Sequence, residues 1–174
     1  MKNTSIYLLS LFAWLSAGLK QPIQEPIYEN LIQRPFSHPE LEDELSISII
    51  GQSIVDGTAI FTINTHDGRR IHHEEFPARF LVGYGLIGEE ATVENMEKYI
   101  KKHVDEFFVD DQFSNPAIAA DEERDEDYSD PEAWKDIKSD QTAIGFYYRV
   151  GEEGGCQIAY SKKQRKTLNY FCCC

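Results

Sequence analysis

The chain has 174 residues and a mass of 20.0 kDa, which is the size of one domain. Its 41% hydrophobic and 27% charged residues exclude a collagen-like repeat, a multi-pass membrane protein and a wholly disordered chain. Seventeen Lys and Arg stand against thirty Asp and Glu, so the net charge is -13. Nucleic acids and anionic lipid surfaces both need concentrated positive charge, and we expect neither as a partner.

Residues 1–18 have the pattern of a secretory signal peptide. Lys2 supplies a positive charge, the apolar run 6–15 follows, and Ser16, Ala17 and Gly18 are the small residues that a signal peptidase requires. The apolar run is about half the roughly 20 residues that a membrane-spanning helix needs. The sequence therefore predicts cleavage after Ala17 or Gly18 and a soluble protein, periplasmic or extracellular, with no membrane insertion after cleavage.

After the signal peptide we expect an extended lead-in and then one domain. Four prolines between residues 19 and 40 remove amide donors and disfavour helix, which predicts an extended, Pro-rich segment there. A single domain over residues 41–174 follows. It begins with three β-rich runs, 44–55, 58–65 and 70–76, separated by Asp56-Gly57 and Asp67-Gly68. Asp-Gly between β-rich runs is a strong hairpin signal, so these runs predict a β-meander.

The rest of the domain alternates helical and β patterns. Apolar residues at helical spacing over 93–108 predict a helix capped by Thr92, with Glu94 and Lys98 paired on its surface. Residues 110–140 form an acidic excursion, in which Asn115-Pro116 and Asp130-Pro131 each predict the start of a short helix. Three further strands are expected over 142–150, 156–161 and 167–174. The order predicts an α+β fold, with an antiparallel sheet and helices packed on one face.

All four cysteines lie in the last predicted hairpin, at Cys156, Cys172, Cys173 and Cys174. A turn with an odd number of residues places Cys156 directly opposite Cys172, at a distance that a disulfide can bridge, whereas an even number places it opposite Phe171. We favour the pair Cys156–Cys172. A prenylated tail, a zinc site, a nucleophilic Cys156 and free thiols remain alternatives, although prenylation conflicts with export and three adjacent thiols cannot reach one ion.

Two regions contain residue types that bind metals. His66, His72 and His73 surround the second predicted turn, but neighbouring strand residues face opposite sides, and a solvated, charged turn is the favoured interpretation. The run 125–130 contains carboxylates suited to calcium, and Asp125, Asp127 and Asp130 are its weak candidate ligands. This run lacks the glycine that an EF-hand loop requires at its sixth position, so no metal or other cofactor is predicted.

The sequence contains no nucleophile elbow, phosphate-binding loop or dinucleotide fingerprint. Negative charge is instead concentrated in residues 110–140, which contain twelve Asp or Glu and only three Lys or Arg. We therefore favour a small exported, acidic, non-catalytic binding protein with a basic protein partner, as an inhibitor or an immunity protein would have. A small extracytoplasmic hydrolase or metal-dependent enzyme and a calcium-binding envelope protein are the alternatives. The predicted interaction residues are Asp121, Glu122, Glu123, Asp125, Glu126, Asp127, Tyr128 and Trp134.

Overall fold

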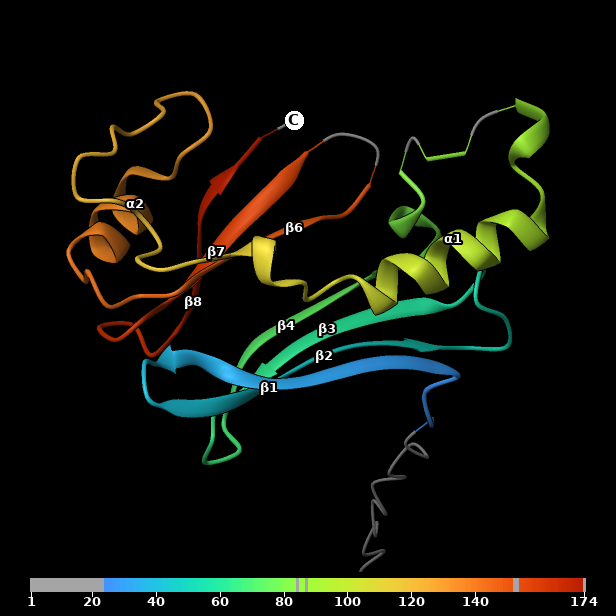
Figure 1. The fold of residues 1–174 in the computed structure, drawn as a ribbon, viewed down its shortest axis with the longest axis horizontal. Helices are drawn as coiled ribbons and strands as arrows, with labels where there is room; N and C mark the ends of the chain where they lie inside the picture. Colours follow the sequence, from blue (N-terminus) through green and yellow to red (C-terminus); the bar gives the residue numbers. More distant parts are fainter. Residues whose placement is uncertain (1–23, 84, 87, 152–153, 174) are drawn as a thin grey trace, which may run out of the picture.

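The computed structural model describes residues 24–83, 85–86, 88–151 and 154–173. The predicted signal peptide and the start of the lead-in lie outside these described residues. The described chain forms two antiparallel sheets of four strands each and two α-helices. In Figure 1, α1 and α2 lie on the same side of the first sheet. The α+β class predicted from the sequence is confirmed, with the β-strands divided between two sheets.

The first sheet consists of β1 (Tyr28–His38), β2 (Leu41–Ile50), β3 (Thr58–Asn64) and β4 (Arg70–Pro77), paired in chain order. The predicted meander is confirmed and has one strand more than expected, because β1 forms from the Pro-rich lead-in. Proline lacks an amide donor, but an edge strand needs donors on only one side. Pro35 lies in such an edge strand, beside an irregularity in its pairing with β2.

The two predicted turns differ from each other. The Asp67-Gly68 hairpin is confirmed. Gly68 has a φ of 81°, and its amide donates a hydrogen bond to Thr65 O at 2.7 Å. The connection between β2 and β3 is longer than a two-residue turn, because β2 ends at Ile50. Ile54 and Val55 are buried in the core from this connection instead of continuing the strand.

The helix α1 (Val93–Asp105) begins after Thr92, whose Oγ1 accepts a hydrogen bond from Asn95 N at 3.2 Å. The predicted cap is therefore confirmed, and so is the surface pair, with Lys98 Nζ 2.7 Å from Glu94 Oε1. Short 3-10 helices lie over Ala78–Leu81, Gly88–Glu90 and Asp110–Gln112.

The second sheet consists of β5 (Phe113–Ser114), β6 (Gly145–Arg149), β7 (Gly155–Ser161) and β8 (Lys166–Cys172). The helix α2 (Pro131–Lys138) begins as predicted, since Asp130 Oδ1 accepts a hydrogen bond from Ala133 N at 2.7 Å. The helix predicted at Asn115-Pro116 is absent from the described residues. Ala117 there donates its amide to Ala143 O and accepts from Tyr170 Oη, so other segments hold this backbone in a non-helical path.

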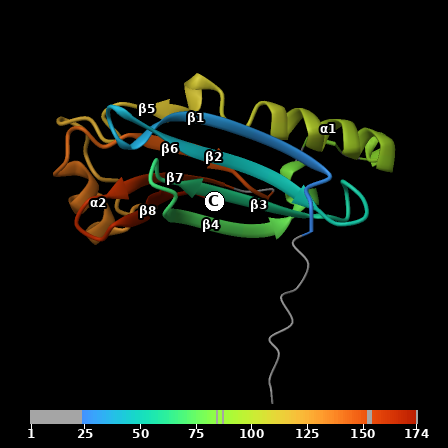
Figure 2. The same cartoon turned by 90° about the horizontal axis from the view of Figure 1, so that it is seen from below.

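Two buried clusters hold these layers together. The larger cluster lies between the two sheets and also takes Ile100 and Val104 from α1. Its centre is aromatic, with Phe61 of the first sheet against Phe146 and Tyr148 of β6 at ring-centroid distances of 5.6 and 5.3 Å. The smaller cluster packs α2 on the far face of the second sheet. Figure 2 shows the strands and helices turned by 90° from Figure 1 and seen from below.

Candidate functional site

The most highly charged segment of the described chain is residues 119–130, called here the acidic loop. It contains seven carboxylates and one guanidinium, Arg124. All seven carboxylate residues are exposed, whereas Arg124 is half-buried and Ser129 is buried. In Figure 1 this loop lies beside α2, at the end of the second sheet that also holds the C-terminus.

Hydrogen bonds within the acidic loop fix its path. Asp125 Oδ1 accepts from Asp127 N at 2.9 Å and from Tyr128 N at 3.3 Å, which closes a local turn. Ser129 N donates to Asp125 O at 3.1 Å, and Arg124 Nη1 donates to Ser129 O at 3.3 Å. Arg124 Nη2 also lies 3.6 Å from Glu126 Oε1, so Arg124 contacts both the backbone and one carboxylate of the loop. All seven carboxylate residues are nevertheless exposed.

Contacts with α2 and β8 attach the acidic loop to the domain. Cys172 N at the end of β8 donates to Tyr128 O at 3.0 Å. The ring of Tyr128 lies 6.1 Å from the ring of Phe171, centroid to centroid, and Tyr128 is still 43% exposed. Lys138 Nζ of α2 donates to Glu122 O. Tyr128 is thus an exposed aromatic residue, surrounded by carboxylates, whose backbone and ring both contact β8.

The structure brings together seven of the eight predicted interaction residues on this exposed loop: Asp121, Glu122, Glu123, Asp125, Glu126, Asp127 and Tyr128. Trp134 differs. It is only 6% exposed, because it lies on the apolar face of α2 and packs against Tyr170 with ring centroids 6.1 Å apart. Trp134 anchors the helix beneath the loop and presents no ring to a partner.

The candidate metal ligands are not assembled into a site. Asp125 and Asp130 each use a carboxylate oxygen to accept backbone amides, in the loop turn and at the α2 cap. His72 and His73 face opposite sides of β4, and His73 Nε2 instead contacts Glu75 Oε1 at 2.9 Å. Across the described part of the chain, no group of three or more His, Cys, Asp or Glu is placed to hold a metal ion.

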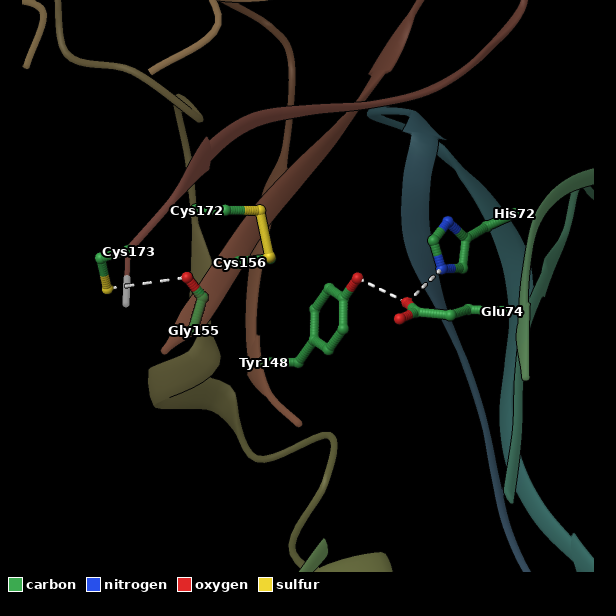
Figure 3. Close-up of a disulfide and its surroundings, with 7 residues drawn as sticks. All are labelled: His72, Glu74, Tyr148, Gly155, Cys156, Cys172 and Cys173. Atoms are coloured by element: carbon green, nitrogen blue, oxygen red, sulfur yellow. Dashed lines mark hydrogen bonds and ion pairs between the residues drawn. A yellow bond between two sulfur atoms is a disulfide. The ribbon is translucent and has the colours of Figure 1, made fainter. Parts of the chain in front are cut away.

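The predicted disulfide Cys156–Cys172 is confirmed and links β7 to β8 (Figure 3). The register that makes it possible has an unexpected origin. The turn between the strands has four residues, 162–165, an even number that by itself places Cys156 opposite Phe171. One extra residue, Tyr170, bulges from β8 between Asn169 and Phe171 and shifts the pairing, so that Cys156 lies opposite Cys172.

A partly buried polar network lies near the disulfide, between the two sheets (Figure 3). Tyr148 Oη donates to Glu74 Oε2 at 2.6 Å, and His72 Nε2 lies 3.7 Å from the same oxygen, an ion-pair distance too long for a hydrogen bond. His72 Nδ1 lies 2.9 Å from Thr167 Oγ1 of β8. The network therefore joins β4 to β6 and β8. Sequence analysis missed it, because no local pattern relates residues 74 positions apart.

The protonation states of Glu74 and Tyr148 are those that a hydrogen bond between the two sheets requires. The interaction with His72 is the main cause that lowers the pKa of Glu74, and the hydrogen bond from Tyr148 also lowers it, while burial opposes both. Burial and the neighbouring carboxylate raise the pKa of Tyr148 well above its ordinary value, so this phenol stays protonated and donates. The side chain of His72 is only 9% exposed and that of Glu74 is 37% exposed, so the network joins the two sheets where their interface meets solvent.

No protein-family model, curated protein or solved structure matches this chain. Among the described residues, no helix is long and apolar enough to cross a membrane.

Proposed function

We propose that the protein is an exported, non-catalytic binding protein that uses the acidic loop to bind a basic protein partner. The observation that carries this proposal is the combination of seven exposed carboxylates with a backbone whose path is fixed by its own hydrogen bonds. A loop that is already ordered loses less conformational entropy on binding than a flexible acidic tail would. The signal-peptide pattern and the disulfide both support an oxidising location outside the cytoplasm.

The chemistry of the loop favours a partner rich in Lys and Arg. Its clustered negative charge would steer a cationic surface toward it and increase the association rate, most strongly at low salt. Tyr128 stands among these carboxylates with its ring partly exposed. An exposed aromatic face can also attract a cation directly, so Tyr128 would contact a Lys or Arg side chain at the centre of the interface.

The test measures the affinity for labelled poly-L-lysine in the wild type and in the variant Asp121→Asn/Glu123→Gln/Asp127→Asn. None of these three side chains makes a hydrogen bond or ion pair within the described residues, so their neutralisation leaves the shape of the loop intact. We expect the affinity to fall about tenfold, which corresponds to about 1.4 kcal/mol, and its salt dependence to become weaker.

A matched control variant distinguishes the effect of the loop carboxylates from the effect of the net charge of the protein. The variant Glu40→Gln/Glu89→Gln/Glu90→Gln removes the same three charges from exposed positions elsewhere on the domain. We expect it to bind poly-L-lysine like the wild type. Equal losses in the two variants would mean that net charge alone attracts the probe, and the proposed role of the acidic loop would be rejected.

A further inference from the structure

Two contacts of the acidic loop involve residues that adjoin the disulfide. Tyr128 O accepts a hydrogen bond from Cys172 N, and the Tyr128 ring contacts the ring of Phe171. Cys172 is itself a half-cystine of the bond to Cys156. The centre of the loop is therefore attached to the strand end that this bond fixes.

Besides the crosslink, the end of β8 is held by the packing of Phe171 against the smaller cluster and by few backbone hydrogen bonds. β8 is an edge strand of its sheet, so its backbone is paired on one side only. Beyond the bulge at Tyr170, only Phe171 and Cys172 continue the pairing with β7, followed by one hydrogen bond from Cys173 N to Gly155 O at 3.1 Å. Short terminal pairings fray readily. The crosslink is thus the strongest restraint on the segment that carries the loop contacts.

The disulfide is also open to exchange, since Cys156 and Cys172 are both only half-buried. A dithiol reductant can attack one of the two sulfur atoms through its thiolate and form a mixed disulfide with that cysteine. The second thiol of the reductant then attacks the mixed disulfide and releases the cysteine as a thiol. The reductant becomes a disulfide, and two electrons and two protons pass to the protein. Cys156 and Cys172 are left as separate thiols.

We infer that Cys156–Cys172 is a redox switch on the acidic loop, an inference that rests on the proposed function of that loop. With the disulfide closed, β8 keeps its register to Cys172 and holds Tyr128 in place. With the disulfide reduced, residues 171–173 fray, Tyr128 loses both contacts, and the loop becomes mobile. A mobile loop must be ordered when it binds, so the basic partner is bound less tightly by the reduced protein.

The experiment compares the oxidised protein with the protein reduced by dithiothreitol, using labelled poly-L-lysine as the probe and hydrogen exchange to follow the backbone. We expect reduction to weaken binding about tenfold and to speed amide exchange in residues 121–130 by about the same factor. β2 and β3 should stay protected in the reduced protein, with exchange far slower than in the loop, because the crosslink joins only β7 and β8 of the other sheet. Cys156→Ser/Cys172→Ser should match the reduced protein, and Cys173→Ser should respond to reduction like the wild type.

Two results would overturn the inference. One is equal binding and equal loop exchange in the oxidised and reduced proteins. The other is complete loss of protection in β2 and β3 together with the loop, which would mean general unfolding. Failure of the proposed function gives a different pattern, because in the oxidised state Asp121→Asn/Glu123→Gln/Asp127→Asn would then bind the probe no more weakly than the control variant Glu40→Gln/Glu89→Gln/Glu90→Gln. The change in loop exchange would still show whether the disulfide controls the loop.

Discussion

At the scale of single residues, His103 shows how a hydrogen bond and burial together fix a charge state. Its Nδ1 lies 2.7 Å from Leu81 O. A carbonyl oxygen can only accept, so Nδ1 carries the proton of the neutral ring. Burial is the main cause that lowers the pKa of His103 below its ordinary value. His103 therefore ties α1 to the segment after β4 as an uncharged side chain.

This charge state predicts a pH dependence of stability. In the unfolded chain a histidine binds its proton near pH 6.5, whereas folded His103 binds it only at lower pH. Acidification below about pH 6.5 thus favours the unfolded state, and stability is lost until the folded pKa is reached. His103→Asn keeps a donor for Leu81 O but cannot titrate. We expect its free energy of unfolding, measured in urea between about pH 7 and pH 5, to fall less than that of the wild type.

His66 provides the control for this prediction, because it is exposed in the turn after β3. His66→Asn should retain the pH dependence of the wild type. If His103→Asn also retains it, the loss of stability on acidification has another origin, and the neutral state assigned to His103 contributes nothing to it.

At the scale of elements, the sequence predicts turns and helix starts correctly where a single residue type decides the backbone conformation. Asp67-Gly68 formed its hairpin because Gly68 accepts positive φ, and Thr92 and Asp130 capped their helices through their side chains. The sequence predicts the wrong secondary structure where contacts with distant residues decide the backbone conformation. β1 needs β2 as a partner to become a strand, and Asn115-Pro116 forms no helix because Ala117 is held by Ala143 and Tyr170.

The candidate site also contains some features that the local sequence predicts and others that depend on distant residues. The carboxylates of the acidic loop were predicted from composition, because a run of charges is almost always exposed. The burial of Trp134 depends on which face of α2 meets the second sheet, and the contact between Tyr128 and Cys172 joins segments 44 positions apart. The disulfide was predicted correctly, but the bulge at Tyr170 that allows it has no signal in the local sequence.

Tyr170 gives a prediction for the second sheet. It is 1% exposed, and its Oη donates to Ala117 O at 3.1 Å, which fixes the segment that leads into the acidic loop. Tyr170→Phe keeps the ring but leaves this carbonyl with only the longer hydrogen bond from Ser114 Oγ, at 3.4 Å. We expect the free energy of unfolding to fall by about 1–2 kcal/mol in urea denaturation. Tyr147→Phe on β6, at a half-buried position, should change it by less than about 0.5 kcal/mol. Equal effects of the two variants would contradict the assigned role of Tyr170.

At the scale of the whole molecule, the larger core makes the two sheets depend on each other. Leu45, Ile47 and Ile49 of β2 and Ile158 of β7 belong to one buried cluster. Each sheet covers an apolar face of the other, so neither can expose that face without losing much of its hydrophobic stabilisation. Unfolding should therefore be a single cooperative transition, although the chain forms two separate hydrogen-bonded sheets.

Phe61 tests this dependence, because it lies on β3 at the centre of the aromatic contacts. Its ring centroid lies 5.3 Å from Phe107 and 5.6 Å from Phe146, and it is fully buried. Phe61→Ala should lower the free energy of unfolding by about 3–5 kcal/mol, since it removes a large, fully buried side chain and leaves a cavity in the core. In native-state hydrogen exchange, β3 of the first sheet and β7 of the second should lose protection by the same factor.

Phe80→Ala is the matched control, because Phe80 is 46% exposed in the segment after β4. Its effect on the free energy of unfolding should be below about 1 kcal/mol, with protection retained in both sheets. If Phe61→Ala reduces protection in β3 but leaves β7 as in the wild type, the sheets unfold separately. The second sheet would then carry the acidic loop and the disulfide as an independent unit, stabilised by α2 and the smaller cluster rather than by the first sheet.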